Sequence, residues 1–502
     1  MCIRGAVLLL RVAVCVAVCV AAAGCGADEC TRVGSAEALA DALADAASGD
    51  RLCLADGRFE GAFEVPPNVD VEICGAGREF TAISGGEGEI ALLVRPQAGA
   101  HVELCDLRIE WQSRAGLVAS GAGSVSLRHV DLQTRDAAST GVGLAAEDLS
   151  SLTLVDVAIR GPVTEEAAAD YALPSPEVAD WVTDLPAPGA MLVHVADGTW
   201  TDVEVSGFAV AGVELVDSAV AWSGGAARTN LGAGVLTFGG ALAIDAVEVT
   251  GLVQGGRLAP TTGMSIAGGA VVQTNGLRIV GNGAGSLGVL QHDSTASHED
   301  LGVSACMERG YQLSSSTGTL ESPVLEIAGG DLSDCGYAGL VLAASSGIVL
   351  EDVTVDRTTS VSTVILGEET SVGDGIQVLT CADPATGCAE ALDDVVLRRV
   401  QLGDNTRVGL LVSGDDQSLA GVSVEEVSVS GSGVGVLGAV YQSAPDAPAG
   451  WASIERSGDV VDADAAFDPA AEALARVGII DPEWMPEQSL SDAGLAAALG
   501  AF

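Results

Sequence analysis

Glu214 and Asp217 are the two carboxylates whose type and position suit acid–base chemistry on a sugar. Hydrolysis of a glycosidic bond needs two opposed carboxyl groups, roughly 5 to 10 Å apart. Glu214 lies in Gly212-Val213-Glu214-Leu215, an alternating segment typical of a β-strand with its third residue pointing outward. Asp217 follows in a predicted turn. The segment recurs along the chain, and its other outward positions carry no acid: Val118, Leu236, Ser265, Val341, Gln377 and Leu411. The sequence therefore offers two candidates but no matching acid beside Glu214.

Other catalytic arrangements are not evident in the sequence. The chain has no lysine, which removes a common base for elimination on an acidic sugar. Among the histidines, His194, His292 and His298 lie in or beside predicted loops and share no spacing. His129 falls at a predicted two-residue turn, in a column where we expect a structural ladder of hydrogen bonds and ion pairs: Asp106, His129, Asp156, Asp352, Arg399 and Glu426. No Ser/His/Asp or Cys/His set can be assembled from these residues.

The cysteines indicate disulfides. Cys74 and Cys105 fall at the same place in consecutive copies of the repeat described below, and neighbouring strands lie about 4.8 Å apart, within the range of a disulfide. Natural further pairs are Cys30 with Cys53 and Cys381 with Cys388, which leaves Cys306 with Cys335 by elimination. The connectivity stays open, because the eight cysteines that follow Cys25 allow many pairings. No pair has zinc spacing, so we expect no metal site at the cysteines.

The first 24 residues predict export. Arg4 and Arg11 supply a positive region, and residues 12–23 are an unbroken apolar and small-residue run. This run is shorter than the roughly 20 residues of a membrane-spanning helix and suits a signal peptide. It ends in Ala22-Ala23-Gly24-Cys25, which resembles the lipobox of bacterial lipoproteins, with Ala22 in place of the usual leucine. The resemblance implies cleavage before Cys25 and a lipid such as palmitate on its sulfur. The alternative is an ordinary secretory signal that leaves a soluble protein.

A repeated pattern of apolar positions, φxφxxφxφ, runs through the remaining chain. Clear copies begin at Val102, Val125, Leu152, Leu242, Val272, Ile348, Val395 and Val422. Each copy is followed, after a loop, by the segment Gly-φ-x-φ, so the unit is three short strands separated by turns. Successive copies fall mostly about 21 to 31 residues apart, which is too short for a β-propeller blade of roughly 40 to 45 residues. The pattern predicts an all-β, single-stranded parallel β-helix solenoid, with Val, Leu and Ile stacked inside.

The two ends of the solenoid read as caps. Residues 38–47 carry Leu39 and Leu43 four apart, as an amphipathic helix would. The following Gly49-Asp50-Arg51-Leu52-Cys53-Leu54 begins the winding, and this opening resembles right-handed β-helix proteins of the pectin-lyase-like superfamily. The resemblance implies a right-handed coil, an N-terminal capping helix, and an active groove along the Gly-φ-x-φ strands in the pectin-degrading members. Short helices at residues 470–477 and 490–499 predict a C-terminal cap.

These features divide the chain into four parts. We expect a signal peptide at residues 1–24, and a lipid anchor, linker and capping helix at 25–50. The β-helix would span 51–444, with loop insertions near 162–188, 291–300 and 367–391, and a capping tail would span 445–502. The apolar outward positions of the Gly-φ-x-φ strands would form an exposed stripe, and we expect loops or the tail to cover it rather than a ligand groove.

Charge and composition limit the partners. The net charge of −47 repels polyanions, so nucleic acid is not expected as a partner, and weak Ca²⁺ binding is the sole cofactor interaction that the charge suggests. We expect a bacterial cell-envelope protein, anchored by lipid to the outer membrane and facing the periplasm or the surface. Its expected function is non-catalytic binding or scaffolding, with a polysaccharide or protein ligand. The alternative is a polysaccharide lyase or glycoside hydrolase whose site is built from loops.

Overall fold

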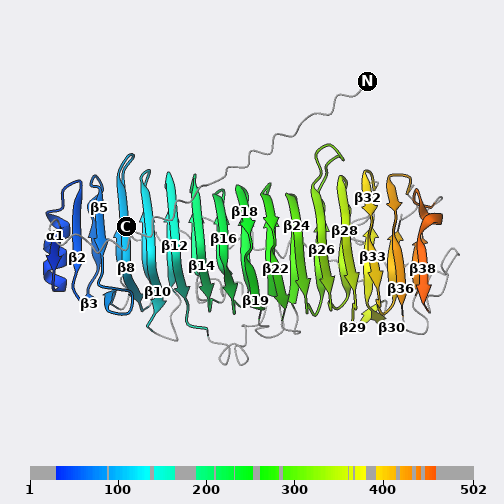
Figure 1. Ribbon diagram of the computed structural model, residues 1–502, viewed down its shortest axis with the longest axis horizontal. Coiled ribbons are helices and arrows are strands. Elements are labelled where there is room, and N and C mark those ends of the chain that lie inside the picture. The colour runs from blue at the N-terminus through cyan, green and yellow to red at the C-terminus, as the bar shows by residue number, and fades with distance from the viewer. Residues whose placement is uncertain are drawn as a thin grey trace, which may run out of the picture.

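The chain folds into one elongated solenoid, seen in the computed structural model (Figure 1). The structure describes residues 30–458 except 87–89, 113, 136–140, 164–187, 209–210, 231, 253–260, 282–285, 360, 366–367, 380–391, 414–418, 432–436 and 443–446. Coils stack along the long axis, from helix α1 (Ala36–Ala44) at one end to strand β38 (Glu455–Gly458) at the other. The architecture is the parallel β-helix that the repeat predicts.

Two parallel sheets, here named sheet A and sheet B, form the walls of the solenoid, and their strands are counted over the described residues alone. Sheet A has 22 strands: β1 (Thr31–Val33), β2 (Asp50–Leu54), β3 (Gly57–Glu60), β5 (Val71–Cys74), β6 (Thr81–Ser84), β8 (His101–Trp111), β10 (Ser124–Thr134), β12 (Ser151–Arg160), β14 (Gly198–Ser206), β16 (Ala219–Arg228), β18 (Ala241–Asp245), β19 (Glu248–Leu252), β21 (Val271–Asn275), β22 (Arg278–Gly281), β24 (Thr295–Ser304), β26 (Leu325–Ser333), β28 (Ile348–Asp356), β32 (Val395–Arg398), β33 (Gln401–Gly403), β35 (Val422–Glu425), β36 (Ser428–Gly431) and β38.

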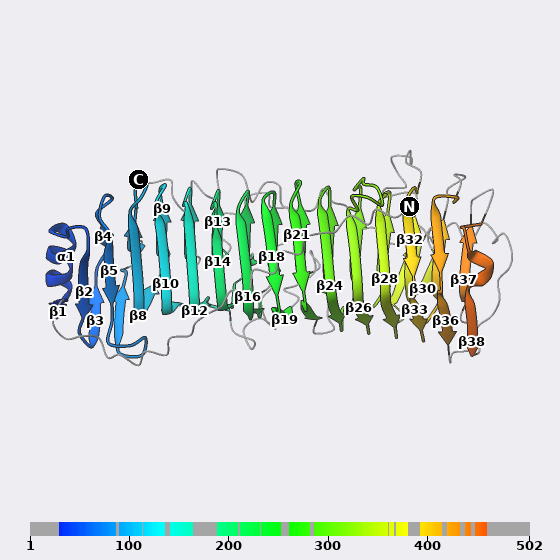
Figure 2. The ribbon, with the colours of Figure 1, turned by 45° about the horizontal axis from the view of Figure 1, so that its top comes forward.

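Sheet B contains the Gly-φ-x-φ segments and has 14 strands, several of which Figure 2 brings into view. They are β4 (Phe63–Val65), β7 (Ile90–Val94), β9 (Ala115–Ser120), β11 (Val142–Glu147), β13 (Ala190–Val193), β15 (Ala211–Val216), β17 (Ala233–Phe238), β20 (Thr261–Ala267), β23 (Ser286–His292), β25 (Arg309–Ser314), β27 (Ala338–Ala343), β31 (Asp374–Leu379), β34 (Val408–Ser413) and β37 (Leu437–Gln442). Every pairing recorded in these two sheets between named strands is parallel, as expected when each coil repeats the last.

Each copy of φxφxxφxφ bends in the middle, and the bend explains its charged column. The residue at the bend adopts positive φ, from 50° at Asp156 to 57° at Asp352 where it is not glycine, and 64° at Gly276. Aspartate is enriched in this left-handed region because its short side chain hydrogen-bonds locally. The expected ladder is present in part: His129 Nδ1 lies 3.1 Å from Asp106 Oδ1, and Arg399 Nε donates to Asp352 Oδ1 at 2.7 Å. These charged residues therefore shape and stabilise the corner of the coil.

Glycine in Gly-φ-x-φ follows from the close approach of successive coils. A Cβ atom added at Gly339 would lie 2.1 Å from Val355 Cγ1 and 2.9 Å from the Gly375 carbonyl oxygen. Any larger residue would therefore displace the core or the next coil. The interior is filled by one continuous apolar cluster, in which Trp200 and Trp222 meet edge to face with ring centroids 5.5 Å apart.

The ends and insertions differ in part from the sequence prediction. Helix α1 caps the first coil and buries Leu39 and Leu43, as predicted. Residues 295–304 form strand β24, so the loop expected near 291–300 is wrong: the polar residues there continue the repeat, and a two-residue turn joins β23 to β24. The insertion near 367–391 begins earlier, with an antiparallel hairpin of β29 (Val361–Ile365) and β30 (Glu368–Val372).

The solenoid also continues past its predicted end at residue 444. Strand β38 pairs in parallel with β36, after the short 3-10 helix η2 (Trp451–Ser453). The predicted signal peptide, Cys25, most of the insertion near 162–188, and the C-terminal helices lie outside the described residues. Among the residues that the structure describes, no helix has the length and apolar character needed to cross a bilayer.

Candidate functional site on the outer face of sheet B

The outward face of sheet B, where the superfamily resemblance implies a groove, is buried in this protein. Its residues stack in columns across the strands; one column runs through Val118, Ala145, Met191, Glu214 and Leu236. Three apolar clusters lie on the face, separate from the interior core: Ile90, Leu93, Ala115, Val118, Val142, Ala145, Met191 and Val193; Ala267, Leu287 and Leu290; and Ala338, Val341, Ala343 and Leu379. The predicted apolar stripe therefore exists and is largely buried: Val118, Val341 and Leu411 are at most 1% exposed, and Leu236 is half-buried.

Glu214 is a carboxyl group on this face that has no second acid beside it in the described parts of the two adjoining strands. It is 2% exposed, and its neighbours in the two adjoining strands are Met191 and Leu236. Its Oε1 atom has no hydrogen-bond partner in the described part of the chain. Desolvation by burial raises the pKa of Glu214 to about 7, because the apolar surroundings disfavour the charged form. A carboxyl group in this state can hold a proton near neutral pH.

Asp217, the second candidate, lies in a different environment. It occupies the turn after β15 with a φ of 45°, and its side chain is exposed. Its side chain lies near His194, whose Nε2 is 3.9 Å from Asp217 Oδ2; the other ring nitrogen of His194 lies 3.3 Å from Asp148. One carboxyl group is thus sealed in the face and the other faces solvent in a turn, so the structure does not join them in one site.

A polar cluster further along the same face was not identified from the sequence. Arg309 Nη1 donates to Gln312 Oε1 at 3.0 Å on β25. On β31, Gln377 Nε2 donates to Asp374 Oδ2 at 2.7 Å, and Arg407 donates to both carboxylate oxygens of Asp374. Asp374 is fully buried. The missed signal was Gly310-Tyr311-Gln312-Leu313, a further copy of Gly-φ-x-φ with a polar outward residue.

A second polar group lies inside the solenoid, around His298. The prediction that His298 lies in or beside a loop is wrong, because its ring points inward from β24 and is buried. The Tyr311 hydroxyl donates to Gln291 Oε1 at 2.5 Å, so His298 Nε2 donates to Tyr311 at 3.1 Å and Nδ1 accepts from Thr274 at 2.8 Å. Burial lowers the pKa of His298 to about 4, which keeps the ring neutral. The group joins the two sheets, and we assign it a structural role.

Two of the predicted disulfides are present. Cys30 is joined to Cys53, with Cα atoms 5.9 Å apart, and Cys74 to Cys105, at 4.5 Å. Cys74 and Cys105 occupy equivalent positions in β5 and β8, as the repeat predicts. Cys381 and Cys388 lie outside the described residues.

The pairing of Cys306 with Cys335 is corrected by the structure, where both are buried free thiols. Their side chains point into the core from the turns after β24 and β26, where each thiol also contacts a backbone carbonyl, of Ser304 or Ser333. The interaction with Cys335 and burial together raise the pKa of Cys306. Pairing by elimination failed because it took every cysteine to be oxidised.

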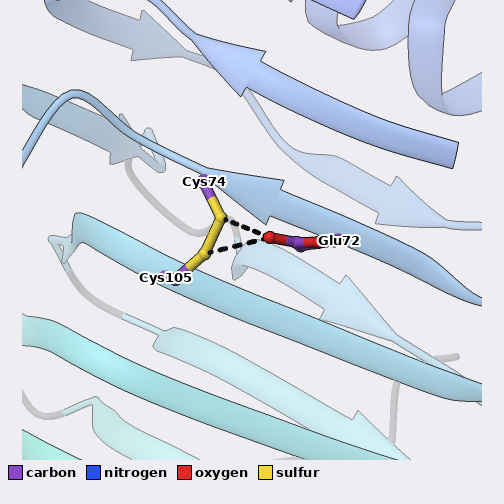
Figure 3. A group of neighbouring side chains, drawn as sticks. All are labelled: Glu72, Cys74 and Cys105. Atoms are coloured by element: carbon purple, nitrogen blue, oxygen red, sulfur yellow. Dashed lines mark hydrogen bonds between the residues drawn. A yellow bond between two sulfur atoms is a disulfide. The ribbon is translucent and has the colours of Figure 1, made fainter. Parts of the chain in front are cut away.

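Glu72 lies beside the second disulfide, and Figure 3 shows its Oε1 atom facing both sulfur atoms, 3.2 Å from Cys74 Sγ and 3.9 Å from Cys105 Sγ. These three residues are of types that bind metals, and their atoms lie within 4.8 Å of one another. The two sulfur atoms are bonded to each other, however, and Glu72 pairs with Arg51 at 2.7 Å. We therefore assign the group as a disulfide with a neighbouring surface ion pair.

Comparison with known proteins gives matches in structure alone. No protein-family model matches the sequence, and no curated protein sequence is similar to it. Similar solved structures include tailspike protein 3 of bacteriophage CBA120 (12% identity, 73% of this chain and 54% of that chain, TM-score 0.34). Others are the A-module of mannuronan C-5 epimerase AlgE4 of Azotobacter vinelandii (11%, 85% and 99%, 0.33) and the catalytic domain of a GH87 α-1,3-glucanase (9%, 88% and 66%, 0.33). The chain spans about half the length of the tailspike chain. These similarities concern the fold alone.

Proposed function

We propose that this protein is an exported, lipid-anchored β-helix that acts by binding or scaffolding, without cleaving glycans. The observation that carries the proposal is the outer face of sheet B, which is buried and largely aliphatic. A glycosidase site on this face would need a second carboxylate opposite Glu214. Its neighbours in the adjoining strands, Met191 and Leu236, cannot titrate.

The alternative, a carbohydrate-active enzyme with a loop-built site, is supported by one specific observation. Glu214 holds its proton near neutral pH, as a general acid does. An acid alone is not sufficient, because the reaction also needs a base or a nucleophile within reach of the same sugar. Asp217 does not supply it from its exposed turn.

Product release from glycans distinguishes the two functions. The mature protein would be incubated with alginate, pectin, α-1,3-glucan and a panel of neutral glycans, with reducing ends and unsaturated products measured between pH 5 and 8. We expect no product above the level of a heat-denatured sample. Turnover that is lost in Glu214→Gln but kept in the exposed control Glu299→Gln would instead establish the enzyme.

The location in the cell is part of the proposal. The lipobox-like segment before Cys25 supports anchoring to a bacterial envelope membrane, facing the periplasm or the surface. Cys25→Ser should abolish incorporation of labelled palmitate and move the protein to the soluble fraction. A lipid anchor would be excluded if the parent protein also takes up no palmitate and the Cys25→Ser variant stays in the membrane fraction to the same extent as the parent.

A further inference from the structure

Arg309 carries a buried positive charge that no carboxylate contacts among the residues that the structure describes. Its side chain is 3% exposed, and its recorded contacts are the hydrogen bond to Gln312 and the ring of Tyr337, whose centroid lies 5.6 Å from Arg309 Cζ. Neither contact supplies a negative charge. Removing a charge from water without a counterion is costly, so a buried cation of this kind requires an explanation.

Asp374 is a second buried charged residue in the column of sheet B that contains Arg309. Its charge is neutralised by neighbouring side chains, and that of Arg309 differs in this respect. Arg309 pairs in register with Ala338, and Ala338 with Asp374, so the two charged residues lie two strands apart. Asp374 is held by Arg407 through both oxygens and by Gln377. The face thus accommodates a buried charge where a neighbouring side chain neutralises it. No described residue is recorded in that role for Arg309.

Glu308, the neighbouring acid in the sequence, makes no direct contact with Arg309. No contact within 4.0 Å joins it to the Arg309 guanidinium among the described ion pairs. Burial raises the pKa of Glu308 and the charge of Arg309 lowers it, so the two groups interact across a distance without forming an ion pair. Ala338 leaves little side-chain bulk beside the guanidinium. Tyr337 is half-buried and Met307 is 43% exposed, so the residues bordering Arg309 reach solvent.

We propose that Arg309, Gln312 and Tyr337 form a binding site for a small ligand that carries a single carboxylate. The planar guanidinium presents parallel N–H donors that match the two oxygens of a carboxylate. Gln312 accepts from Nη1 and fixes the orientation of the group, and the Tyr337 ring offers an apolar surface to the rest of the ligand. The net charge of −47 disfavours polyanions, which selects a ligand with one charge. This inference rests on the proposed binding function.

Thermal unfolding with matched small probes tests the site. At pH 7, we expect acetate to raise the melting temperature above that in sodium chloride of equal ionic strength, because a ligand of the folded state stabilises it. Acetamide, which has the same shape without the charge, should have no effect. An equal response to acetamide, or a larger response to inorganic phosphate, would overturn the carboxylate assignment.

Variants separate a binding role of Arg309 from a structural one. Arg309→Met should raise the melting temperature without ligand, since it removes an uncompensated charge, and should weaken acetate binding at least ten-fold, about 1.4 kcal/mol. Arg357→Met, at an exposed arginine, should keep the acetate response. A lower melting temperature in Arg309→Met, or an unchanged response in Arg309→Lys, which keeps the charge but loses the planar fork, would contradict the proposal. Failure of these tests leaves the product-release result, and hence the proposed function, standing.

Discussion

Asp374→Asn should lower the free energy of unfolding by about 3–5 kcal/mol, because it removes the buried carboxylate that accepts two hydrogen bonds from the guanidinium of Arg407. Asp374 is fully buried and Arg407 nearly so, and Arg407 Nε donates to Asp374 Oδ1 at 2.7 Å. The asparagine keeps the shape but not the charge. The measurement is urea-induced unfolding at pH 7, read from the midpoint and the slope.

A matched control uses the exposed pair of Asp334 and Arg357, whose side chains are about half exposed and 3.0 Å apart. Asp334→Asn should cost about 0–1 kcal/mol, as exposed ion pairs do. Arg407→Gln in the Asp374→Asn background should cost less than the sum of the single changes, because the two residues act as one unit. A loss in Asp374→Asn no larger than in Asp334→Asn would contradict the buried pair.

Glu214→Gln should stabilise the protein at pH 8 by about 3 kcal/mol and have little effect at pH 4. The pKa of Glu214 is raised from 4.5 in the unfolded chain to about 7 in the folded protein. Its protonated form therefore supports the fold fully below pH 4.5, and this stability is lost as the pH rises through 7. Glutamine cannot ionise, so the variant should lose this dependence. The measurement is the difference in unfolding free energy between variant and parent across pH 4 to 8.

The exposed Glu299 provides the control for this change. Glu299→Gln should change the unfolding free energy by no more than about 0.5 kcal/mol, because surface substitutions have small effects. A Glu214→Gln variant that parallels the parent protein over the whole pH range would mean that Glu214 ionises freely in the folded state. The face would then be hydrated rather than sealed.

The architecture could be predicted from the sequence because the same three constraints act on every coil. Alternate apolar residues must stack inside, the bend favours residues such as Asp106 that tolerate positive φ, and the close approach at Gly339 excludes a side chain. Each of these leaves a mark at a fixed place in the repeat. The Cys74–Cys105 pairing followed from the same register.

The errors arose where polar residues replace apolar ones in the repeat. His298 occupies an inward position, and its hydrogen bonds with Thr274 and Tyr311 form only when the coils are stacked. The apolar pattern is interrupted there, which suggested a loop. Arg309 and Asp374 were missed for a related reason: their neighbours across the sheet lie about 30 residues away, so no local spacing reveals the cluster.

Hydroxyl-radical footprinting of three methionines measures whether the outer face of sheet B is buried. Met191 lies on that face at 5% exposure, Met264 in the core at 0%, and Met307 on the surface at 43%. Thioether oxidation follows solvent access. We predict that Met191 is oxidised as slowly as Met264 and far more slowly than Met307. Oxidation of Met191 at the rate of Met307 would show an open groove and contradict this account.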